Sequence, residues 1–402
     1  MSPDEVIAAI TTKESEPSRF LIPTLFLARL AIDIDRWSIF ALLPAIRQVF
    51  FVPEASVGLV VTAQAIPSLI APALGGVSDV RGRKSMLTTG LSILAISMVI
   101  IAIAPNFSIL LLARFMVGLA SIIIIPNLIA YLGDKVIYSE RGRAVSVVQA
   151  SWPVAAILGT PFMAFVLHSL GWSWPFILLA TIASLALTAI QFTMPANAQV
   201  EEKTTRAWIT QVRQVAQNPV MWTVMVIALM AAGAVNATFT FYSIWLVNTF
   251  HLDIVRVGWT SSLSGLGSLG GILIAGVVCD RIGKKSTMVI GFSLAALCLA
   301  SISWLSTTVY LPLLIAFLFA VGYDMAFVGY YAFLPELLPD SRGLATSFGS
   351  SMLALGSIAG SMSAGLLWPV GGFSLVSMAS SLMLFVSAIL VYKFVVEHPR
   401  YS

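Results

Sequence analysis

The stretch GGVSDVRGRKS, residues Gly75 to Ser85, returns as GVVCDRIGKKS, residues Gly276 to Ser286. At an offset of 201 residues, six of the eleven positions are identical. The same offset aligns two further pairs, Arg141-Gly142 with Arg342-Gly343 and Gly159 with Gly360. Three matches in one register indicate that the chain contains two copies of one structural unit.

Both copies stand out because the rest of the chain is strongly apolar. Of its 402 residues, 58% are hydrophobic and 10% are charged, and the mean hydropathy is +0.95. A soluble domain of this length needs far more ionised surface, so the composition predicts an integral membrane protein. The net charge of +4 does not indicate nucleic-acid binding, because the basic residues border apolar segments.

Segments long enough to cross a bilayer recur along the sequence. A spanning helix needs about 20 mostly apolar residues, and twelve segments fit this requirement. Backbone groups in lipid must be hydrogen-bonded within the segment, so we expect α-helices. The predicted limits are 20–46, 55–77, 85–104, 108–131, 144–168, 174–194, 219–247, 256–278, 287–305, 310–333, 344–367 and 374–394. The predicted fold class is an all-α bundle of twelve transmembrane helices.

The basic residues predict how this bundle is oriented. Seventeen Lys and Arg residues lie on the two tails and the even-numbered connections, against Arg47 and Arg256 on the other face. Basic residues are enriched in cytoplasmic loops. Both termini are therefore predicted to be cytoplasmic.

The longest internal polar stretch, Pro195 to Pro219, divides the spans six and six. Its middle, Trp208–Val215, has the pattern of an amphipathic helix that lies on the membrane surface. The predicted organisation is a cytoplasmic tail (1–19), a six-helix bundle (20–194), a central cytoplasmic loop (195–218), a second six-helix bundle (219–394) and a cytoplasmic tail (395–402).

The repeated stretch also carries a resemblance to a known family. The second copy fits in full the pattern G-x-x-x-D-R-x-G-[RK]-[RK] of the major facilitator superfamily, whereas the first copy has Val80 where the pattern has Arg. The chain resembles this superfamily along essentially its whole length, and in particular its proton-coupled drug and metabolite branches. The resemblance implies two six-helix repeats with a substrate site between them near the bilayer midplane.

The resemblance further implies that both loops are cytoplasmic gates, which help to hold the outward-facing state through ion pairs and helix-end contacts. The glycines allow a two-residue reversal between helices. The alternative is that the basic residues only enforce topology, although topology requires neither the Asp nor the Gly. The predicted gate residues are Gly75, Asp79, Gly82, Arg83, Lys84, Gly276, Asp280, Arg281, Gly283, Lys284 and Lys285.

Charged residues inside the spans are candidates for function. A buried charge costs at least about 2.5–3.5 kcal/mol on insertion scales, and the acidic residues well inside spans are Asp33, Asp35 and Asp324. Arg29, Asp33 and Arg36 can share one face of span one. Asp35 points elsewhere. The shared face could also be a self-neutralising ladder without any further role.

Two motifs in the first half resemble proton-coupled carriers. Asp35-Arg36 followed by Pro44 is similar to the first spans of several proton-coupled branches, and Arg114-x-x-x-Gly118 matches a motif whose Arg is thought to assist proton transfer. Apolar surroundings favour the protonated carboxyl group, whereas a nearby Arg favours the ionised form. We therefore predict that Asp33, Asp35 and Arg114 couple transport to protons, with Arg114 meeting one of the two carboxylates in one state.

The second half lacks equivalents of these charges. At the repeat offset, Asp35 aligns with Asn236 and Arg114 with Ile315. The polar and aromatic residues of the second half suit substrate contact, although packing and interhelical hydrogen bonding are the alternative for each of them. The predicted substrate-binding residues are Arg36, Asn236, Tyr242, Tyr323 and Asp324.

These features predict a proton-coupled secondary transporter of a small organic solute in the cytoplasmic membrane, working by alternating access. Export by proton antiport is slightly favoured, because VAAILGTPFMA in span five keeps part of a Gly-Pro pattern of antiporters, with Thr160 in place of the Gly. PELLPDSRG, Pro335 to Gly343, and the arginines inside spans favour the alternative, a symporter that takes up an organic anion.

A lipid flippase and a non-transporting sensor on the same fold are further alternatives. An enzyme is not predicted, because the predicted spans contain no His cluster and no metal-ligand spacing. We expect no cofactor and no metal site. The expected partners are protons, the organic solute and the lipid bilayer, and the expected state is a monomer.

Overall fold

The structure is a computed structural model, and it describes residues 20–71, 81–136, 138–194, 219–334, 337 and 342–395. Every secondary-structure element within these ranges is a helix, which confirms the predicted all-α class. The predicted surface helix at 208–215 and the gate residues Gly75 and Asp79 lie outside these ranges.

Short helical elements in the first half join into longer spans. Elements η1 to η2 together form the second span, and α7 to α9 form the fifth. The bounds are α2 (Leu21–Phe50), η1 (Glu54–Ser56), α3 (Gly58–Ala65), η2 (Ile66–Ile70), α5 (Arg83–Ala102), α6 (Phe107–Lys135), α7 (Tyr138–Gln149), α8 (Ser151–Val154), the π-helical η3 (Ala155–Gly159), α9 (Thr160–Leu170) and α10 (Ser173–Thr193).

The second half contains longer uninterrupted helices. The bounds are α12 (Pro219–Phe250), α13 (Ile254–Ile282), α14 (Lys284–Ile302), α15 (Tyr310–Phe333) and α16 (Arg342–Phe394). Within α16 the backbone leaves the helical conformation at Gly371 and Gly372, so this element is two helices joined at a kink.

In the described part of the chain, nine helices are long and apolar enough to cross a membrane. One of them, Phe348–Phe394, contains the kink and therefore corresponds to two predicted spans. The other two predicted spans are α2, which has the required length but carries the charges of span one, and the shorter apolar segment Glu54–Ile70. The helices thus correspond to the twelve predicted spans.

The second predicted gate loop is tighter than the sequence suggests. Helix α13 extends to Ile282, so Asp280 and Arg281 belong to its last turn, and α14 begins at Lys284. The reversal between the two helices takes the single residue Gly283, whose φ is 88°. The expected two-residue reversal is wrong, because one glycine in this conformation is sufficient.

The sequence repeat is also a repeat of backbone conformation. Gly82 and Gly283, which precede α5 and α14, have φ values of 80° and 88°. The same offset of 201 residues joins Gly171 and Gly372, with φ values of 94° and 59°. Equivalent turns of both halves therefore depend on glycine, since other residues adopt these angles only with strain.

Equivalent helices also approach each other through equivalent glycines. A Cβ atom at Gly159 would collide with Ile34 of α2, and one at Gly360 would collide with Gly233 of α12. The helices α2 and α12 open the two halves. The packing of span five on span one is therefore repeated by span eleven on span seven.

Replacing Gly283 by alanine is expected to lower the free energy of unfolding by about 1–3 kcal/mol, because alanine would be held at a strained φ. The matched control is Gly276→Ala in the same gate stretch, where the added methyl group meets no atom within 4 Å and alanine favours the helix. Thermal unfolding of the detergent-solubilised protein checks this result. Equal unfolding temperatures for the two variants would contradict it.

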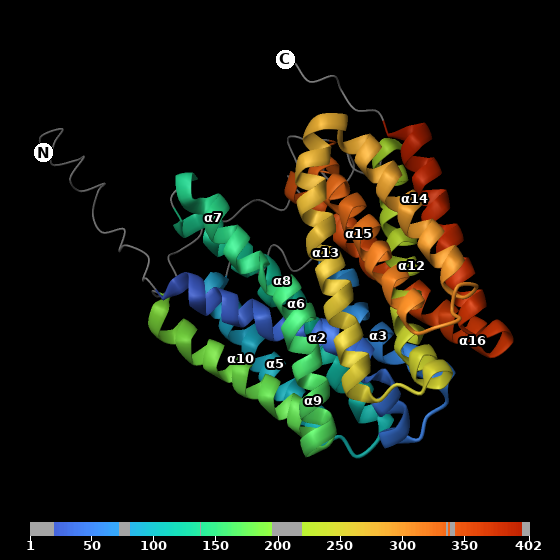
Figure 1. The fold of residues 1–402 in the computed structure, drawn as a ribbon. Helices are drawn as coiled ribbons and strands as arrows, with labels where there is room; N and C mark the ends of the chain where they lie inside the picture. Colours follow the sequence, from blue (N-terminus) through green and yellow to red (C-terminus); the bar gives the residue numbers. More distant parts are fainter. Residues whose placement is uncertain are drawn as a thin grey trace, which may run out of the picture.

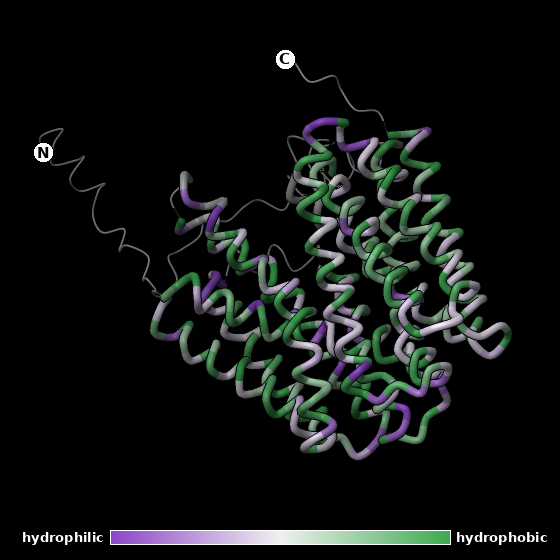
Figure 2. Tube along the Cα trace, in the orientation of Figure 1, coloured by the Kyte–Doolittle hydropathy of each residue, from purple (hydrophilic) through white to green (hydrophobic). Residues whose placement is uncertain are grey.

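Figure 1 shows two helical bundles that meet at one end and diverge toward the other. We call the end at which α2 begins and α16 ends the terminal end, and the opposite end the far end. In Figure 2 hydrophobic residues dominate the helices, and many of the hydrophilic ones gather near their ends. This distribution suits a membrane-embedded bundle whose halves are closed together at the far end.

Candidate functional site

A buried ion pair joins the first and fourth spans. Arg114 Nη1 on α6 lies 2.6 Å from Asp35 Oδ1 on α2, and the two side chains are 0% and 1% exposed. Gln64 on α3 donates from Nε2 to Asp35 Oδ2 at 3.1 Å and accepts a hydrogen bond from Arg114 Nη2. We call these three residues, which come from three helices, the Asp35 cluster.

Close packing of α6 on α3 explains the spacing of Arg114 and Gly118. These residues lie one turn apart on the same face of α6. A Cβ atom at Gly118 would collide with the main-chain carbonyl of Gln64, so glycine permits the close approach of the two helices. The approach brings Arg114 within hydrogen-bonding distance of the Gln64 side chain. The motif therefore has a geometrical basis in this chain.

Asp33 belongs to a separate polar group. Its carboxylate accepts hydrogen bonds from Arg29 Nε at 2.9 and 3.1 Å and from Ser151 Oγ at 2.6 Å. Asp33 is fully buried. The predicted ladder is thus present between Arg29 and Asp33. In this state it is Asp35, and not Asp33, that meets Arg114.

Arg36 is the accessible charge of span one. It is exposed, although its neighbours Asp35 and Trp37 are both buried. Its Cζ atom lies 6.0 Å from the ring centroid of Trp152 on α8, which is a cation–π distance. Within the described part of the chain, Arg36 has neither an ion-pair partner nor a hydrogen-bond partner. Its guanidinium is therefore available to a ligand.

Asp324 on α15 faces the same region from the second half. Tyr331, about two turns later on the same helix, lies within electrostatic range of both Arg36 and Asp324. Ser268 of α13 is a polar neighbour of Asp324. Three of the predicted substrate-binding residues, Arg36, Tyr323 and Asp324, are therefore brought to one region between the halves.

The other two predicted substrate-binding residues have partners inside the second half. Asn236 Nδ2 donates to Ser357 Oγ on α16 and to the carbonyl of Ala232, both at 2.9 Å. Tyr242 is buried, and its hydroxyl donates to the carbonyl of Pro312 at 3.4 Å. Both side chains thus join α12 to its neighbours, as the packing alternative expects.

Aromatic rings connect the surroundings of Arg36 to those of Asp324. The ring centroids of Trp152 and Trp37 are 5.2 Å apart, and those of Trp37 and Phe239 are 6.1 Å apart. Phe239 lies 6.0 Å from Phe319, which lies 5.7 Å from Tyr323. These separations are typical of interacting rings. We call the five residues the aromatic arc; it runs from α8 and α2 of the first half to α12 and α15 of the second.

The described gate residues of the first copy contact neighbouring helices. Lys84 Nζ donates to the carbonyls of Gln191 and Met194 at 2.9 and 2.6 Å, and Arg83 Nη1 donates to Asn127 Oδ1 at 3.4 Å. In the second copy, Lys285 Nζ lies 5.6 Å from the ring centroid of Tyr392. These contacts join α5 to α6 and α10, and α14 to α16. A gating role for the two loops stays a prediction.

Two prolines release carbonyl groups that bind the opposite half. Proline has no N–H, so Pro44 and Pro161 leave the carbonyls four residues earlier without a helical donor. The carbonyl of Phe40 accepts a hydrogen bond from Ser243 Oγ on α12 at 2.6 Å. The carbonyl of Ile157 accepts one from Ser262 Oγ on α13 at 2.7 Å. Pro44 and Pro161 thus each provide an acceptor in the first half for a serine of the second.

Glu54 adds a polar contact at the far end. It forms an ion pair with Arg47 at 2.7 Å, accepts from Trp368 Nε1 at 2.6 Å and accepts from Asn248 Nδ2 at 3.2 Å. Arg47 belongs to the first half, whereas Trp368 and Asn248 belong to the second. One carboxylate therefore connects α2, α12 and α16 where the halves meet.

The double variant Ser243→Ala/Ser262→Ala lacks both serine hydroxyls. We expect it to raise the ratio of molecules with an open far end to molecules with a closed far end roughly ten-fold. Each hydrogen bond contributes about 0.5–1.5 kcal/mol. The measurement is the distance between spin labels at the exposed residues Val49 and Val370, in a background without the two cysteines.

The matched control for this measurement is Ser38→Ala, because Ser38 Oγ donates to the Ile34 carbonyl within α2. The longer label distance should become more populated only in the double variant. An unchanged distance distribution in the double variant would show that these hydrogen bonds do not hold the far end closed.

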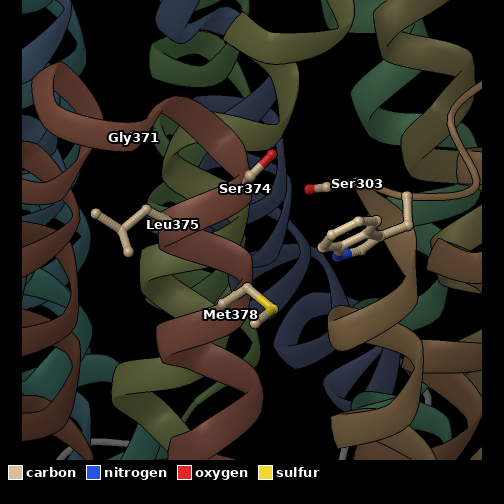
Figure 3. Close-up of a pocket in the computed structure, with 6 residues that line it drawn as sticks. Ser303, Gly371, Ser374, Leu375 and Met378 are labelled. Atoms are coloured by element: carbon tan, nitrogen blue, oxygen red, sulfur yellow. The ribbon is translucent and has the colours of Figure 1, made fainter.

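A shallow hollow on the second half lies away from these residues. It is lined by Ser303, Trp304, Gly371, Ser374, Leu375 and Met378, between α14 and α16 (Figure 3). The lining is mainly apolar, with Trp304 and Met378 exposed. The hollow shares no lining residue with the candidate site.

Sequence reasoning did not identify four residues of the site. Gln64, Ser151 and Trp152 contact Asp35, Asp33 and Arg36 respectively, and Glu54 joins the halves. Ser151 and Trp152 stand in the sequence Ser-Trp-Pro, which matches no motif that would indicate a functional site. Gln64, a polar residue in the apolar run of span two, was the available signal, because such residues usually have interhelical partners.

Two bundles of repeated helices are a plan common among secondary transporters. The family model of the Major Facilitator Superfamily matches residues 25–339 and 232–402. The chain belongs to this superfamily, as the sequence pattern predicts. It is a multi-pass integral protein of the cytoplasmic membrane that transports small solutes, and it is not an enzyme.

Similar proteins extend this assignment. The chain is 24% identical over 358 residues to Multidrug resistance protein 2 of Bacillus subtilis, an alignment that covers 87% of this chain and 88% of that protein. The solved structure of the nucleoside transporter NupG has a TM-score of 0.78 at 16% identity, covering 93% of this chain and 98% of the other. A bacterial homolog of the human lysosomal transporter Spinster has a TM-score of 0.77 at 14% identity, covering 94% and 97%.

Proposed function

We propose that the protein exports a small organic solute in exchange for protons, and that Asp35 carries the proton. The observation behind this proposal is the Asp35 cluster, a carboxylate that is 1% exposed on its side chain and paired with Arg114 at 2.6 Å. An ion pair buried this deeply is a weak contributor to stability. Ionisable residues at this depth of a membrane protein are functional by default.

The ion pair of Asp35 and Arg114 can exist in two states, formed or separated. While Arg114 contacts Asp35, the guanidinium neutralises the carboxylate. If α6 moves away from α2, a proton on Asp35 would take the place of that positive charge. Gln64 then still provides a hydrogen-bond partner for either residue. Proton uptake and release would therefore accompany the relative movement of these helices.

Export is favoured over uptake by two observations. The fifth span keeps Gly159 and Pro161 and contains a π-helical segment, a distortion that is frequent at functional sites. The similarity to a protein named for multidrug resistance supports the same direction. The second candidate is symport of an organic anion, which the unpaired Arg36 favours.

Transport by the purified protein in liposomes distinguishes the two directions. With a panel of cationic dyes and organic acids and an imposed pH gradient, antiport accumulates the solute in the more acidic compartment, because protons leave it as the solute enters. Symport accumulates the solute in the more alkaline compartment. Accumulation in the acidic compartment is expected. Accumulation that does not depend on the gradient would refute proton coupling.

A further inference from the structure

We propose that the solute is a rigid aromatic compound with an anionic group at one end and a cationic group at the other, bound between Arg36 and Asp324 along the aromatic arc. The inference rests on the proposed function, because it assigns the substrate class of the same central region.

Arg36 assigns the anionic end. A guanidinium in the middle of a span is expensive to insert and is normally paired. The other two intramembrane arginines follow this rule, since Arg29 pairs with Asp33 and Arg114 with Asp35. Arg36 is exposed and forms no ion pair or hydrogen bond among the described residues, and the carboxylates within its electrostatic range, Asp33 and Asp35, are each paired with another arginine. A carboxylate or a similar anion matches the fork of a guanidinium, so an anionic ligand would supply the missing partner.

Asp324 assigns the cationic end. No described residue forms an ion pair with it, and its polar neighbours Tyr323, Tyr331 and Ser268 are neutral. The two unpaired charges of the central region therefore have opposite signs and come from opposite halves. A ligand with both charges would neutralise both and would connect the halves across the path of their relative movement.

The aromatic arc assigns the body of the ligand. It begins at Trp152, over which Arg36 lies at 6.0 Å, and ends at Tyr323, the residue before Asp324. Trp37 and Phe319 are buried, so a ligand would contact the partly exposed rings of Trp152, Phe239 and Tyr323. Flat rings gain both apolar area and favourable ring geometry against such rings. Several ring-to-ring steps separate the ends of the arc. The two charged groups must therefore lie at opposite ends of the body and not on neighbouring atoms.

Calorimetric binding to the full-length protein in lipid nanodiscs tests this class. The amphoteric probes are 4-(aminomethyl)benzoate and 4′-(aminomethyl)biphenyl-4-carboxylate. For comparison, biphenyl-4-carboxylate lacks the amine and 4-(aminomethyl)biphenyl lacks the acid. At least one amphoteric probe should bind ten-fold or more tightly than either comparison compound, since one charged hydrogen-bonded contact is worth roughly ten- to a hundred-fold in affinity.

Variants assign each contact. Arg36→Gln should lower the affinity of the amphoteric probe to about that of the amine, and Asp324→Asn should lower it to about that of the acid. Arg256→Gln and Asp253→Asn are the matched controls, because these residues pair with each other at the far end with side chains 72% and 51% exposed. Both controls should bind as the wild type does.

Three results would overturn the proposal: neither amphoteric probe binds, neither binds more tightly than both comparison compounds, or Arg36→Gln keeps the wild-type affinity. These results are separable from failure of the proposed function, which is read from pH-driven transport in Asp35→Asn. If Asp35→Asn loses pH-driven transport but no amphoteric probe binds more tightly than the comparison compounds, only the proposed substrate class is wrong. If an amphoteric probe binds more tightly but Asp35→Asn keeps pH-driven transport, only the assignment of Asp35 as the proton carrier is wrong.

Discussion

Replacing Asp35 by asparagine should reduce pH-driven solute accumulation in liposomes to the level of protein-free vesicles. Asparagine has nearly the same shape and keeps an oxygen that can accept from Arg114, but it cannot take up a proton. The variant loses stability because Arg114 keeps its buried charge, but the folded protein should still carry out downhill exchange of the solute. The measurement compares gradient-driven accumulation with downhill exchange in the same preparation.

The matched control for this variant is Asp253→Asn. Asp253 is also an aspartate of the chain, but its carboxylate caps α13 at the far end and is half exposed. The control should accumulate the solute as the wild type does. Gradient-driven accumulation by Asp35→Asn at the wild-type level would show that another group carries the proton, and Asp33 would be the first candidate.

The second large effect is expected for Arg114→Gln, on stability. The substitution leaves the carboxylate of Asp35 buried without its cation, and breaking a buried pair in this way costs about 3–5 kcal/mol. The double variant Asp35→Asn/Arg114→Gln removes both charges and should recover most of this loss. Thermal unfolding in detergent is measured for Asp35→Asn, for Arg114→Gln and for the double variant. The resulting double-mutant cycle gives the interaction energy of the pair.

Arg47→Gln is the control for this stability series, because the pair of Arg47 with Glu54 is partly exposed, with side chains 43% and 21% accessible. Exposed pairs contribute about 0–1 kcal/mol. If Arg114→Gln costs no more than Arg47→Gln, or if the effects of the two substitutions in the double variant simply add, the Asp35 cluster is not the tightly coupled unit proposed.

The fold was largely predictable because two strong signals agree. Apolar length predicts each spanning helix, and the 201-residue register predicts that the halves are equivalent, which the φ values of Gly82 and Gly283 confirm. Helix ends were less predictable. The gate residues Asp280 and Arg281 are polar, yet they continue α13, because a polar last turn can extend out of the apolar region.

The candidate site was only partly predictable. Spacing along one helix indicates which residues share a face, so the contact of Arg29 with Asp33 follows from the sequence. Spacing does not indicate which other helix packs on that face. The sequence around Asp35 therefore could not predict its hydrogen bond with Gln64, and the sequence around Arg36 could not predict its contact with Trp152. These contacts depend on tertiary packing, which the glycines at close approaches determine.

The central claim is that Asp35 carries the proton that is exchanged for the solute, and proton release on solute binding tests it most directly. A solute found in the transport panel is added to the purified protein in weakly buffered detergent solution, and the pH change is recorded. The wild type should release protons as the solute binds, whereas Asp35→Asn should bind the solute with no release. Equal release by the wild type and by Asp35→Asn would contradict the claim.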